Sequence, residues 1–456
     1  MHTLYTNCVL FDGSDGCSAR PGSAILVDGT TIAAVYFGDI PIPELPRADT
    51  YVDLEGAFVM PGFINAHAHH FGFGKPSAHL TGGIGQKLLL SFAHSALGKP
   101  YLKTVAHKAL QAALFSGVTT ERGVGDLSYA DVAVRDAIAA QKLQGPRFVV
   151  SGPAITCPGG HGANTFASVA TTPEEFAKEV DIRAAHGVDF IKITVTGGVM
   201  DSEVKGEAGL LRMSLEQTQA AVEAARAHGL YVASHTEGPE GVEVCINAGV
   251  YTIEHGAPVA PELLARWKSS GAADVCTASV AYPLSVMPTS VSKLPEAGLY
   301  NSALIRNRVV EAARACREAG IPVALGTDAA CPFVTHYDFW REILLYHELV
   351  GASPAEALRC ATLGTARVLH LDDITGSIEP GKDADFIAFN VGANPLENLY
   401  DLRLVNKVVA RGTLIDNCAE KLKGYRLPEI DKLLDGLYTL ERLAAIAQES
   451  HAAPAE

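Results

Sequence analysis

The sequence lacks the features that would indicate a secreted, membrane-bound or nucleic-acid-binding protein. Its first residues contain neither a basic segment nor an apolar run, so no secretory signal peptide is predicted. No stretch reaches about 18 consecutive apolar residues, so no membrane span is predicted. No basic block offsets the formal net charge of −15, so we expect neither nucleic acid nor a membrane as a partner.

The cysteines also argue against an oxidising environment. There are nine, scattered along the chain, and none is arranged as C-x-x-C. An odd number without paired spacing is not typical of a disulfide framework or of a cysteine zinc site. We therefore expect most of these thiols to be reduced and buried, and we expect the protein to be cytoplasmic.

The two ends of the chain share a pattern that differs from the middle. The 456 residues are 48% hydrophobic and 19% charged, which is typical of a globular protein, and the length suits a large barrel with a minor domain. The first sixty residues, and those after residue 375, contain short alternating runs separated by turns, which predicts β-strands. We expect 1–60 and 376–425 to pair into a small β-sandwich domain.

The middle of the chain, residues 61–375, has the pattern of β/α units. Short β-branched runs alternate with amphipathic stretches at intervals of about 20–45 residues, which predicts a parallel sheet. Eight such runs predict an α/β fold, a (β/α)₈ TIM barrel. They are residues 62–67, 117–123, 147–155, 190–198, 231–238, 251–256, 274–280 and 323–329. Capping boxes that begin at Ser214 and Ser353 predict two of the helix starts.

Three further segments are expected to surround the barrel. Long connections over 70–99 and 281–301 follow predicted strand ends, on the face where barrel enzymes place their sites. The glycines between 72 and 85 are compatible with either a lid or a passive surface loop. Residues 426–456 are expected to form a helical tail, because apolar residues recur there at helical spacing. This tail would pack on the barrel or on a sister subunit of a homo-oligomer.

The strongest local signal is the segment Asn65-Ala66-His67-Ala68-His69 at the end of the first predicted barrel strand. Residues i and i+2 of a strand point to the same side, so the two imidazoles can bind one ion. A lone H-x-H is weak evidence, but other ionisable residues recur at predicted strand ends. They are Lys192, His235, His255 and Asp328. Because an unpaired charge in an apolar strand is costly, we expect these side chains to converge near the barrel mouth.

This set of residues resembles the metal sites of the amidohydrolase superfamily, and the resemblance covers nearly the whole chain. It includes Val59-Met60-Pro61-Gly62-Phe63 before the first barrel strand and Pro380-Gly381-Lys382-Asp383-Ala384-Asp385 near the C-terminus. Thr196-Gly197-Gly198-Val199-Met200 and Gly159-Gly160-His161-Gly162 are similar to strings of the imidazolonepropionase-like branch. That branch holds prolidase-type dipeptidases, ochratoxinase-like enzymes and the phenylurea and molinate hydrolases.

The resemblance implies two divalent metal ions, with Zn²⁺ favoured and Co²⁺ or Mn²⁺ as alternatives. The first ion would be held by His67, His69 and Asp328. The second would be held by His235 and His255, and Lys192, carbamylated by CO₂, would bridge the two. A carbamate is a bidentate anion that suits this role, whereas free lysine is a compact cation. The alternative is a buried Lys192 paired with Asp328 or another carboxylate.

The resemblance also implies a reaction, the hydrolysis of a C–N bond in a small molecule by a metal-activated water. Asp328 would accept the proton of the water and pass it to the leaving nitrogen. His161, on the loop after the third barrel strand, resembles the histidine that contacts the substrate carbonyl or carboxylate in relatives. The alternative is a loop histidine that is hydrogen-bonded to the backbone.

Two positions depart from the branch and bear on the substrate. Dipeptidase-like members carry Tyr two residues after the fifth-strand histidine, where this chain has Glu237, and their T-T-V-R-D is here Thr119-Thr120-Glu121-Arg122-Gly123. Two carboxylates about 4 Å apart repel by about 4 kcal/mol at an effective dielectric of 20. Unless His161 or Arg122 compensates, Glu237 disfavours a substrate carboxylate. We therefore expect a neutral amide, urea or (thio)carbamate, such as a phenylurea.

Three alternatives stay open at this point. If Glu237 is only a solvated loop acid, an Xaa-Pro or Xaa-Arg dipeptidase or an N-acyl amino acid hydrolase fits as well. A mononuclear deaminase-type hydrolase would not use Lys192 as a ligand, but such enzymes carry H-x-x-E after the fifth strand, whereas this chain has His235-Thr236-Glu237. A scaffolding protein that has lost its ligands is disfavoured by the complete ligand set.

Overall fold

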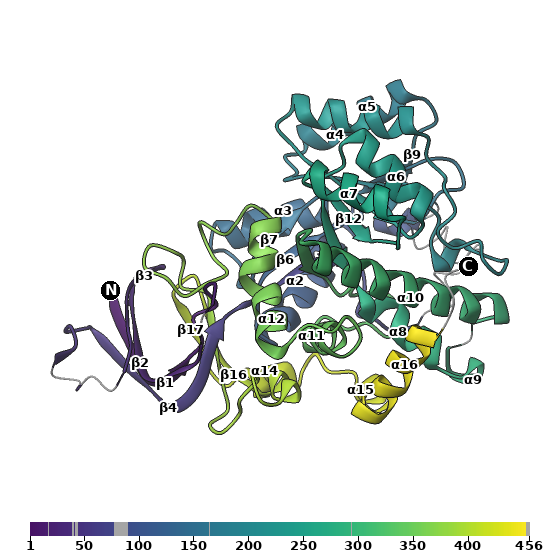
Figure 1. Cartoon of the computed structure of the whole chain (residues 1–456). Helices are drawn as coiled ribbons and strands as arrows, with labels where there is room; N and C mark the ends of the chain where they lie inside the picture. The colour runs from purple at the N-terminus through teal and green to yellow at the C-terminus, as the bar shows by residue number, and fades with distance from the viewer. Residues whose placement is uncertain are drawn as a thin grey trace.

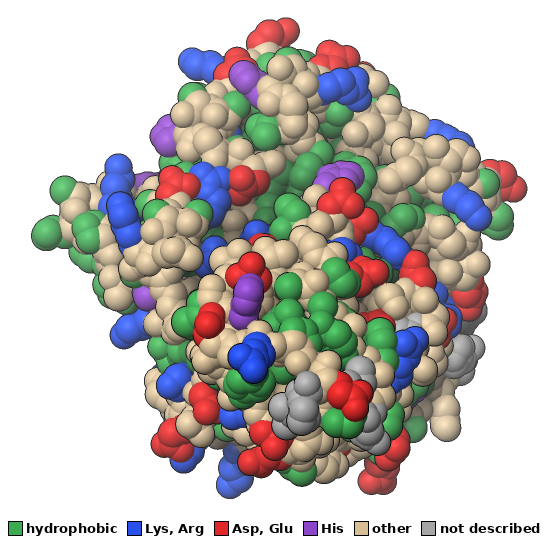
Figure 2. Space-filling model, turned by 90° about the vertical axis from the view of Figure 1, so that its left-hand side faces the viewer, with side chains coloured by type: hydrophobic (Ala, Val, Ile, Leu, Met, Phe, Trp, Pro, Cys, Tyr) green, Lys and Arg blue, Asp and Glu red, His purple; other side chains and the backbone are tan. Residues whose placement is uncertain are grey.

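The computed structural model describes residues 1–16, 18–38, 41, 44–76, 90–163, 165–292 and 294–452. A β-sheet unit that contains the N-terminus lies at the left of Figure 1, and a larger unit of strands and helices lies at the right and holds the C-terminus. On the face seen in Figure 2, acidic and basic side chains are interspersed. No helix among the described residues is long and apolar enough to cross a membrane.

The β-sheet unit joins both ends of the chain in one seven-stranded sheet of order β17-β16-β15-β4-β1-β2-β3. Its strands are β1 (His2–Leu10), β2 (Arg20–Asp28), β3 (Thr31–Tyr36), β4 (Thr50–Pro61), β15 (Phe386–Phe389), β16 (Val405–Ala410) and β17 (Thr413–Ile415). β4 pairs parallel to β1 and antiparallel to β15, with Met60 opposite Ile387. Alternate side chains such as Tyr5 and Phe386, whose ring centroids are 5.1 Å apart, form its buried core. The predicted pairing of N- and C-terminal segments is therefore present.

The larger unit contains parallel strands in two sheets. β5 (Phe63–Ala68), β6 (Val118–Gly123) and β7 (Arg147–Val150) form one of them. The other has the order β14-β13-β12-β11-β10-β8-β9, with β8 (Ala154–Thr156), β9 (Ala167–Val169), β10 (Ile191–Thr194), β11 (Val232–Thr236), β12 (Thr252–His255), β13 (Ala273–Cys276) and β14 (Val323–Leu325). Each of the eight predicted runs overlaps at least one of these strands. The α/β class with parallel strands is confirmed.

Backbone contacts connect these two sheets at both of their ends. Asp189, just before β10, donates its amide hydrogen to the carbonyl of Val150 in β7 at 2.8 Å. At the other end an isolated bridge joins Ala68 to Ala329, and the amide of Asp328 donates to the carbonyl of His67 at 2.8 Å. The carboxyl ends of β5 and β14 are therefore held side by side, although the ladder hydrogen bonds do not form one closed sheet.

Helices follow most of the parallel strands. The longer ones are α2 (Gly98–Phe115), α3 (Ala130–Ala139), α4 (Pro173–Ala185), α5 (Leu215–Ala227), α6 (Pro239–Ala248), α7 (Pro261–Ser270), α10 (Glu296–Ala319) and α11 (Phe339–Glu348). The capping boxes predicted at Ser214 and Ser353 are confirmed, at the starts of α5 and of α12 (Pro354–Arg359). A further capping box, from Thr172 to Glu175, begins α4.

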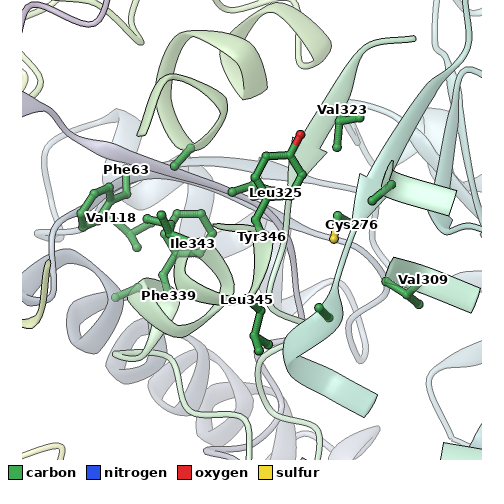
Figure 3. Packing of buried hydrophobic residues seen from close by; sticks show 14 of the residues in the cluster. Phe63, Val118, Cys276, Val309, Val323, Leu325, Phe339, Ile343, Leu345 and Tyr346 are labelled. Atoms are coloured by element: carbon green, nitrogen blue, oxygen red, sulfur yellow. The ribbon is translucent and has the colours of Figure 1, made fainter. Parts of the chain in front are cut away.

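The main core lies between the parallel strands and the surrounding helices. Figure 3 shows Phe339 and Ile343 of α11 against Phe63 and Val118 of β5 and β6. The ring centroids of Phe63 and Phe339 are 5.8 Å apart. Eight of the nine cysteines are described, and all eight are free thiols, most of them buried in this apolar environment. The apolar packing outside the strands fixes the positions of the polar residues at their carboxyl ends.

The region after the seventh barrel strand differs from its prediction. The run 274–280 is a strand only to Cys276, and 281–301 is not a simple connection, because it contains α8 (Ala278–Val286), α9 (Thr289–Ser292) and the start of α10. The carboxylate of Glu342 accepts hydrogen bonds from the amides of Ala278 and Ser279, at 3.0 and 2.7 Å. The first turn of α8 is therefore capped from another helix, more than 60 residues away, which no local pattern reveals.

The segments flanking the site are described in part. In the connection 70–99, residues 77–89 lie outside the described residues, so the predicted lid is not placed there. The C-terminal tail forms α15 (Pro428–Asp435) and α16 (Leu440–Ala452). It packs on the larger unit of its own chain: the hydroxyl of Tyr282 donates to the carbonyl of Leu437 at 2.9 Å, and the Tyr438 ring lies 4.9 Å from that of Tyr282.

Candidate metal centre

The side chains predicted to bind metal are brought together at the carboxyl ends of the parallel strands. All six line one cavity of about 570 Å³, and they come from β5, β10, β11, β12 and the segments after β5 and β14. Ring centroids are 4.9 Å apart for His67 and His255, and 4.6 Å apart for His235 and His255. Lys192 and Asp328 lie in the same cavity wall and are buried. The convergence expected from the strand-end pattern is therefore present.

His67, His69 and Asp328 form one group. Oδ1 of Asp328 lies 3.1 Å from Nε2 of His69 and 3.5 Å from Nε2 of His67. The other ring nitrogens are occupied: Nδ1 of His67 is 2.7 Å from the carboxylate of Glu254, and Nδ1 of His69 is 2.8 Å from the carbonyl of Gly125. Because these oxygens accept hydrogen bonds, each Nδ1 donates to its partner, and each Nε2 is the nitrogen that faces Asp328 and the cavity. This is how metal-binding histidines are usually oriented.

His235 and His255 form a second group. Nδ1 of His255 lies 2.6 Å from the hydroxyl of Thr277, whereas Nε2 of His235 is buried without a hydrogen-bond partner among the described residues. Burial lowers the pKa of both imidazoles well below its usual value, and neighbouring cationic groups add to this effect. Both rings are therefore neutral near pH 7, which is the form that binds a metal ion.

The cavity is lined by polar atoms that lack partners. Nζ of Lys192, Nε2 of His235 and Oε2 of Glu237 are buried and make no hydrogen bond within the described part of the chain. Leaving such groups unpaired costs about 1–3 kcal/mol each, more for charged ones. Divalent cations with an anionic bridging ligand would provide partners for these atoms, so the donor set fits a metal centre. The alternative of a Lys192–Asp328 ion pair is not observed, because Lys192 Nζ has no partner.

Burial also lowers the pKa of Lys192 to about 8, although Glu254 opposes this shift. The lower value increases the share of the uncharged amine near neutral pH. The uncharged amine is the nucleophile that can react with CO₂ to form a carbamate.

The backbone at two of these residues is strained. His255 and Asp328 have φ angles of 72° and 58°, in the left-handed region that side-chain-bearing residues seldom adopt. Each such residue costs about 1–3 kcal/mol, and such residues cluster at functional sites. Close packing adds a second constraint: a Cβ on Gly326 would lie 2.4 Å from Cβ of His67, so only glycine allows β5 and the end of β14 to approach this closely.

Glu237 is a buried member of the site. It lines the cavity, and one ligand atom from each of His235, Glu237 and His255 lies within 4.8 Å of the others. It is therefore not the solvated loop acid of the sequence-based alternative. Burial raises its pKa to about 8, against the opposing effect of His161. In the metal-free chain Glu237 is largely protonated at pH 7, so the full charge repulsion assumed from the sequence does not apply there.

His161 also lies in the cavity wall, but its contacts differ from the predicted alternative. Its Nδ1 pairs with the carboxylate of Asp201, in the short helix η3 (Val199–Asp201), and its ring stacks on His235 with centroids 4.1 Å apart. Burial lowers the pKa of His161, but the charge of Asp201 outweighs this effect and raises it overall. A charged partner, not the backbone, therefore holds this ring beside the metal-binding residues.

Arg122 and Glu254 form a buried pair at the centre of the strands. Nη2 of Arg122 lies 2.8 Å from Oε1 of Glu254, and Nε donates to the carbonyl of Ala66 at 2.6 Å. Arg122 does not line the cavity, so it is not placed to neutralise a charge beside Glu237. Glu254 was not among the residues predicted from the sequence, although it is an ionisable residue in an apolar strand beside His255. Asp201 was not predicted either, because no motif in the sequence marks it as a partner of His161.

The remaining wall of the cavity is mainly apolar. Phe71 and Phe166 stack with centroids 6.0 Å apart, and Phe166 also lies 5.0 Å from the His69 ring. Other apolar side chains in the wall are those of Leu90, Phe92, Tyr101, Leu284 and Ile305. Among the described lining residues, Lys192 is the only Lys or Arg. Apart from Lys192 and the histidines, the described part of the cavity wall therefore offers apolar surface to a substrate and no basic side chain to a substrate carboxylate.

Comparison with known proteins identifies the class to which this site belongs. The Amidohydrolase family matches residues 58–415, so the chain belongs to the amidohydrolase family. The chain is an enzyme, a hydrolase that acts on C–N bonds. The family predicted from the strand-end residues is confirmed.

Individual relatives cover almost the same length as this chain. The imidazolonepropionase of Halobacterium salinarum is 25% identical over 424 residues, which cover 86% of this chain and 92% of that protein. A candidate prolidase from Bifidobacterium longum has a TM-score of 0.81 and 34% identity, covering 96% of this chain and 99% of its own. A Xaa-Pro dipeptidase with methionine bound in its active site has a TM-score of 0.78 and 30% identity. The match covers 91% of this chain and 100% of the dipeptidase chain.

Proposed function

We propose that this chain hydrolyses a small, neutral amide, urea or (thio)carbamate, of which a phenylurea is an example, at two divalent metal ions. The observation that carries the proposal is the composition of the cavity: metal-binding side chains at one place, and a mostly apolar wall without a free basic residue around them. A substrate carboxylate bound against the apolar wall, away from the metal ions, would be desolvated without an arginine or a second lysine as partner, which is costly.

In the proposed centre, His67, His69 and Asp328 would hold one ion. His235 and His255 would hold the second, and carbamylated Lys192 would serve both. Zn²⁺ suits imidazole and carboxylate ligands, and Co²⁺ or Mn²⁺ are the alternatives. The buried, unpaired Nζ of Lys192 and Nε2 of His235 support this assignment.

When bound, the ions would supply an activated water and polarise the scissile carbonyl, so that hydrolysis would join the water oxygen to the carbonyl carbon and break the C–N bond. Asp328, which contacts both His67 and His69, accepts the proton of the water and delivers it to the leaving nitrogen. His161 contacts the substrate carbonyl from the side of His235, and the Asp201 carboxylate keeps its ring in place. Glu237 lines the same wall and offers no cationic partner to a substrate carboxylate.

The proposed architecture is a (β/α)₈ barrel over residues 61–375. The contacts of Asp189 with Val150 and of Ala68 with Ala329 support its closure. Residues 1–60 and 376–425 form the β-sandwich domain, and 426–456 form the helical tail.

A dipeptidase is the second candidate. It is favoured by the solved relatives at 30% identity or more, a candidate prolidase and a Xaa-Pro dipeptidase. The two candidates differ in one property that an assay can measure, because a dipeptide carries a carboxylate beside the leaving nitrogen and a phenylurea does not.

The metal assignment is tested with Lys192→Ala. We expect turnover of a substrate identified from a panel of phenylureas, thiocarbamates, dipeptides and N-acyl amino acids to be lost. Acetate or propionate should restore part of the activity, because a short carboxylate fits the space of the carbamate. Lys192→Arg is the matched control, since the larger side chain leaves no such space and should not be rescued. Full activity of Lys192→Ala without additive would instead support a mononuclear hydrolase.

The substrate assignment is tested with matched pairs of amides or ureas that differ only in a carboxylate beside the leaving nitrogen. We expect a higher kcat/KM for the neutral member of each pair, and we expect Glu237→Tyr to move the ratio towards the acid. Glu203→Gln, at an exposed acidic residue of the same wall, should leave the ratio nearly unchanged. Preference of the wild-type enzyme for the acid would favour the dipeptidase.

A further inference from the structure

A second cluster of metal-binding side chains lies outside the catalytic cavity. His70 follows β5, Glu121 is in β6 and His336 lies after β14, and none of the three lines the cavity. All three are buried, and one ligand atom from each lies within 4.8 Å of the others. Nε2 of His70, Oε2 of Glu121 and Nδ1 of His336 have no hydrogen-bond partner among the described residues. Three unpartnered polar atoms therefore face one another in the protein interior.

The opposite polar atom of each side chain has a partner that fixes its orientation. Nε2 of His336 donates to the carbonyl of Gly72 at 2.9 Å, and Nδ1 of His70 donates to the carboxylate of Asp126 at 2.9 Å. Oε1 of Glu121 accepts a hydrogen bond from the side-chain amide (Nδ2) of Asn65 at 3.1 Å. A carbonyl or carboxylate behind each imidazole is the usual arrangement around metal-binding histidines.

We propose that His70, Glu121 and His336 bind one divalent cation at a site separate from the catalytic centre. Two imidazole nitrogens and a carboxylate oxygen are a donor set that suits Zn²⁺. Because the three atoms lie within 4.8 Å of one another, a central ion lies about 2.8 Å or less from each, and a contraction of under about 1 Å reaches the bond lengths of zinc. A water molecule can complete the coordination.

The chemistry of the three atoms favours a cation over a water or a proton. With the other ring nitrogens donating, all three atoms are acceptors when both imidazoles are neutral. A water molecule has two hydrogens and can satisfy only two of them. If Nε2 of His70 is protonated, it can donate a hydrogen bond to Glu121 or to His336 but not to both. One of these two buried acceptors then has no partner. One cation contacts all three atoms at once.

The charges of the carboxylates around the cluster also favour a cation. Glu121 and Asp126 are both buried, and within the described residues neither forms an ion pair with Lys or Arg. Their one ion-pair partner in the described structure is His70, whose charge can balance at most one of the two carboxylates, so one negative charge stays uncompensated in the interior, which is costly. A divalent cation between Glu121 and the two histidines neutralises this charge.

The proposed ion would position the catalytic ligands without touching the substrate. His70 directly follows His69, and Glu121 holds Asn65, whose side-chain oxygen accepts from the amide of Thr327 at 3.1 Å. Thr327 directly precedes Asp328. The ion would therefore link β5, β6 and the segment after β14, the elements that carry the first group of metal ligands.

The direct test is anomalous diffraction from crystals of the full chain grown with Zn²⁺, with data above and below the zinc absorption edge. We expect an anomalous peak enclosed by His70, Glu121 and His336, about 2.0–2.2 Å from each donor atom. Density without an anomalous signal, which indicates water, or the absence of density would overturn the proposal. Peaks at the catalytic centre are scored separately, so this result does not depend on the proposed function.

The second test is zinc content after dialysis, measured by inductively coupled plasma mass spectrometry. Glu121→Gln and His336→Gln should each lose about one Zn²⁺ per chain relative to the wild type, with a lower Tm. His228→Gln, at an exposed histidine, is the matched control and should lose none. Lys192→Ala should keep the ion that His336→Gln loses. Unchanged zinc content in both cluster variants would overturn the proposal, and if they do not fold, the diffraction test on the wild type decides.

Discussion

Replacing Glu254 by Gln removes the negative charge of a carboxylate that contacts both Arg122 and His67. Its oxygens lie 2.8 and 3.0 Å from Nη2 of Arg122, and Oε2 lies 2.7 Å from Nδ1 of His67. The hydroxyl of Thr252 donates to Oε1 at 2.6 Å. All these side chains are buried. The variant therefore leaves the guanidinium of Arg122 in the interior without its countercharge.

The expected cost follows from this burial. Removing one partner of a buried ion pair costs about 3–5 kcal/mol, and because Gln keeps one oxygen acceptor for Arg122 we expect about 3 kcal/mol. Burial alone would raise the pKa of Glu254, but Arg122 and Lys192 hold it well below its usual value. A lowered pKa in the folded state gives stability that is complete above the ordinary value of 4.5 and is lost as the pH falls below it. The difference in the free energy of unfolding between the wild type and the Glu254→Gln variant should therefore be constant above about pH 5 and should become smaller in acid.

The same variant should weaken metal binding. Without the carboxylate that holds Nδ1 of His67, the affinity of the adjacent metal position should fall about 10–100-fold. Urea unfolding of the metal-free chain, followed by circular dichroism between pH 4 and 8, measures stability. Competition with a chromophoric chelator measures affinity. Glu223→Gln, at an exposed position of α5, is the control and should change neither.

A double variant tests the cause of the loss. Arg122→Met together with Glu254→Gln removes the uncompensated cation, so the double variant should lose at least about 1 kcal/mol less than the sum of the two single variants. Additive losses, or a loss below about 1 kcal/mol in Glu254→Gln alone, would refute the argument that the buried charge is responsible.

Two further predictions concern the ligands themselves. Asp328→Asn should lower kcat about 10²–10⁴-fold with far less change in KM, measured by steady-state kinetics at verified metal content, and wild-type turnover with metals bound would show that Asp328 is not the proton acceptor. Gly326→Ala places a Cβ 2.4 Å from that of His67, so we expect a loss of about 1–3 kcal/mol in stability and weaker metal binding by chelator competition. Gly424→Ala, with no atom closer than 3.8 Å, should be nearly neutral; an equally mild Gly326→Ala would contradict the close-approach argument.

Local sequence patterns predicted the parallel strands and the residues at their ends. His67, His235 and His255 stand out because ionisable side chains in apolar strands are unfavourable without a partner. The capping boxes at Ser214 and Ser353 predicted helix starts, because a capping box depends only on residues three positions apart. These features are encoded within a few residues of chain and need no knowledge of the packing.

Contacts between distant residues were not predictable in this way. The start of α8 depends on Glu342, which lies 64 positions after Ala278 in the sequence. Glu237 is buried because strands and helices from several parts of the chain enclose it. One of them is α10, whose Arg308 donates a hydrogen bond to the backbone carbonyl of Glu237 at 3.0 Å. Its pKa of about 8 follows from that burial and not from its neighbours in sequence.

The sequence by itself determined which side chains could bind metal and which end of each strand carries them, because strand alternation and the direction of the chain are local properties. The tertiary structure decided which polar side-chain atoms lie close enough to one another to bind the same ion or to form a hydrogen bond. It placed Glu254 behind His67, Asp201 behind His161 and the three atoms of His70, Glu121 and His336 within 4.8 Å of one another. It also enclosed the site with apolar side chains, because burial and electrostatic environment depend on elements that are adjacent only after the chain has folded.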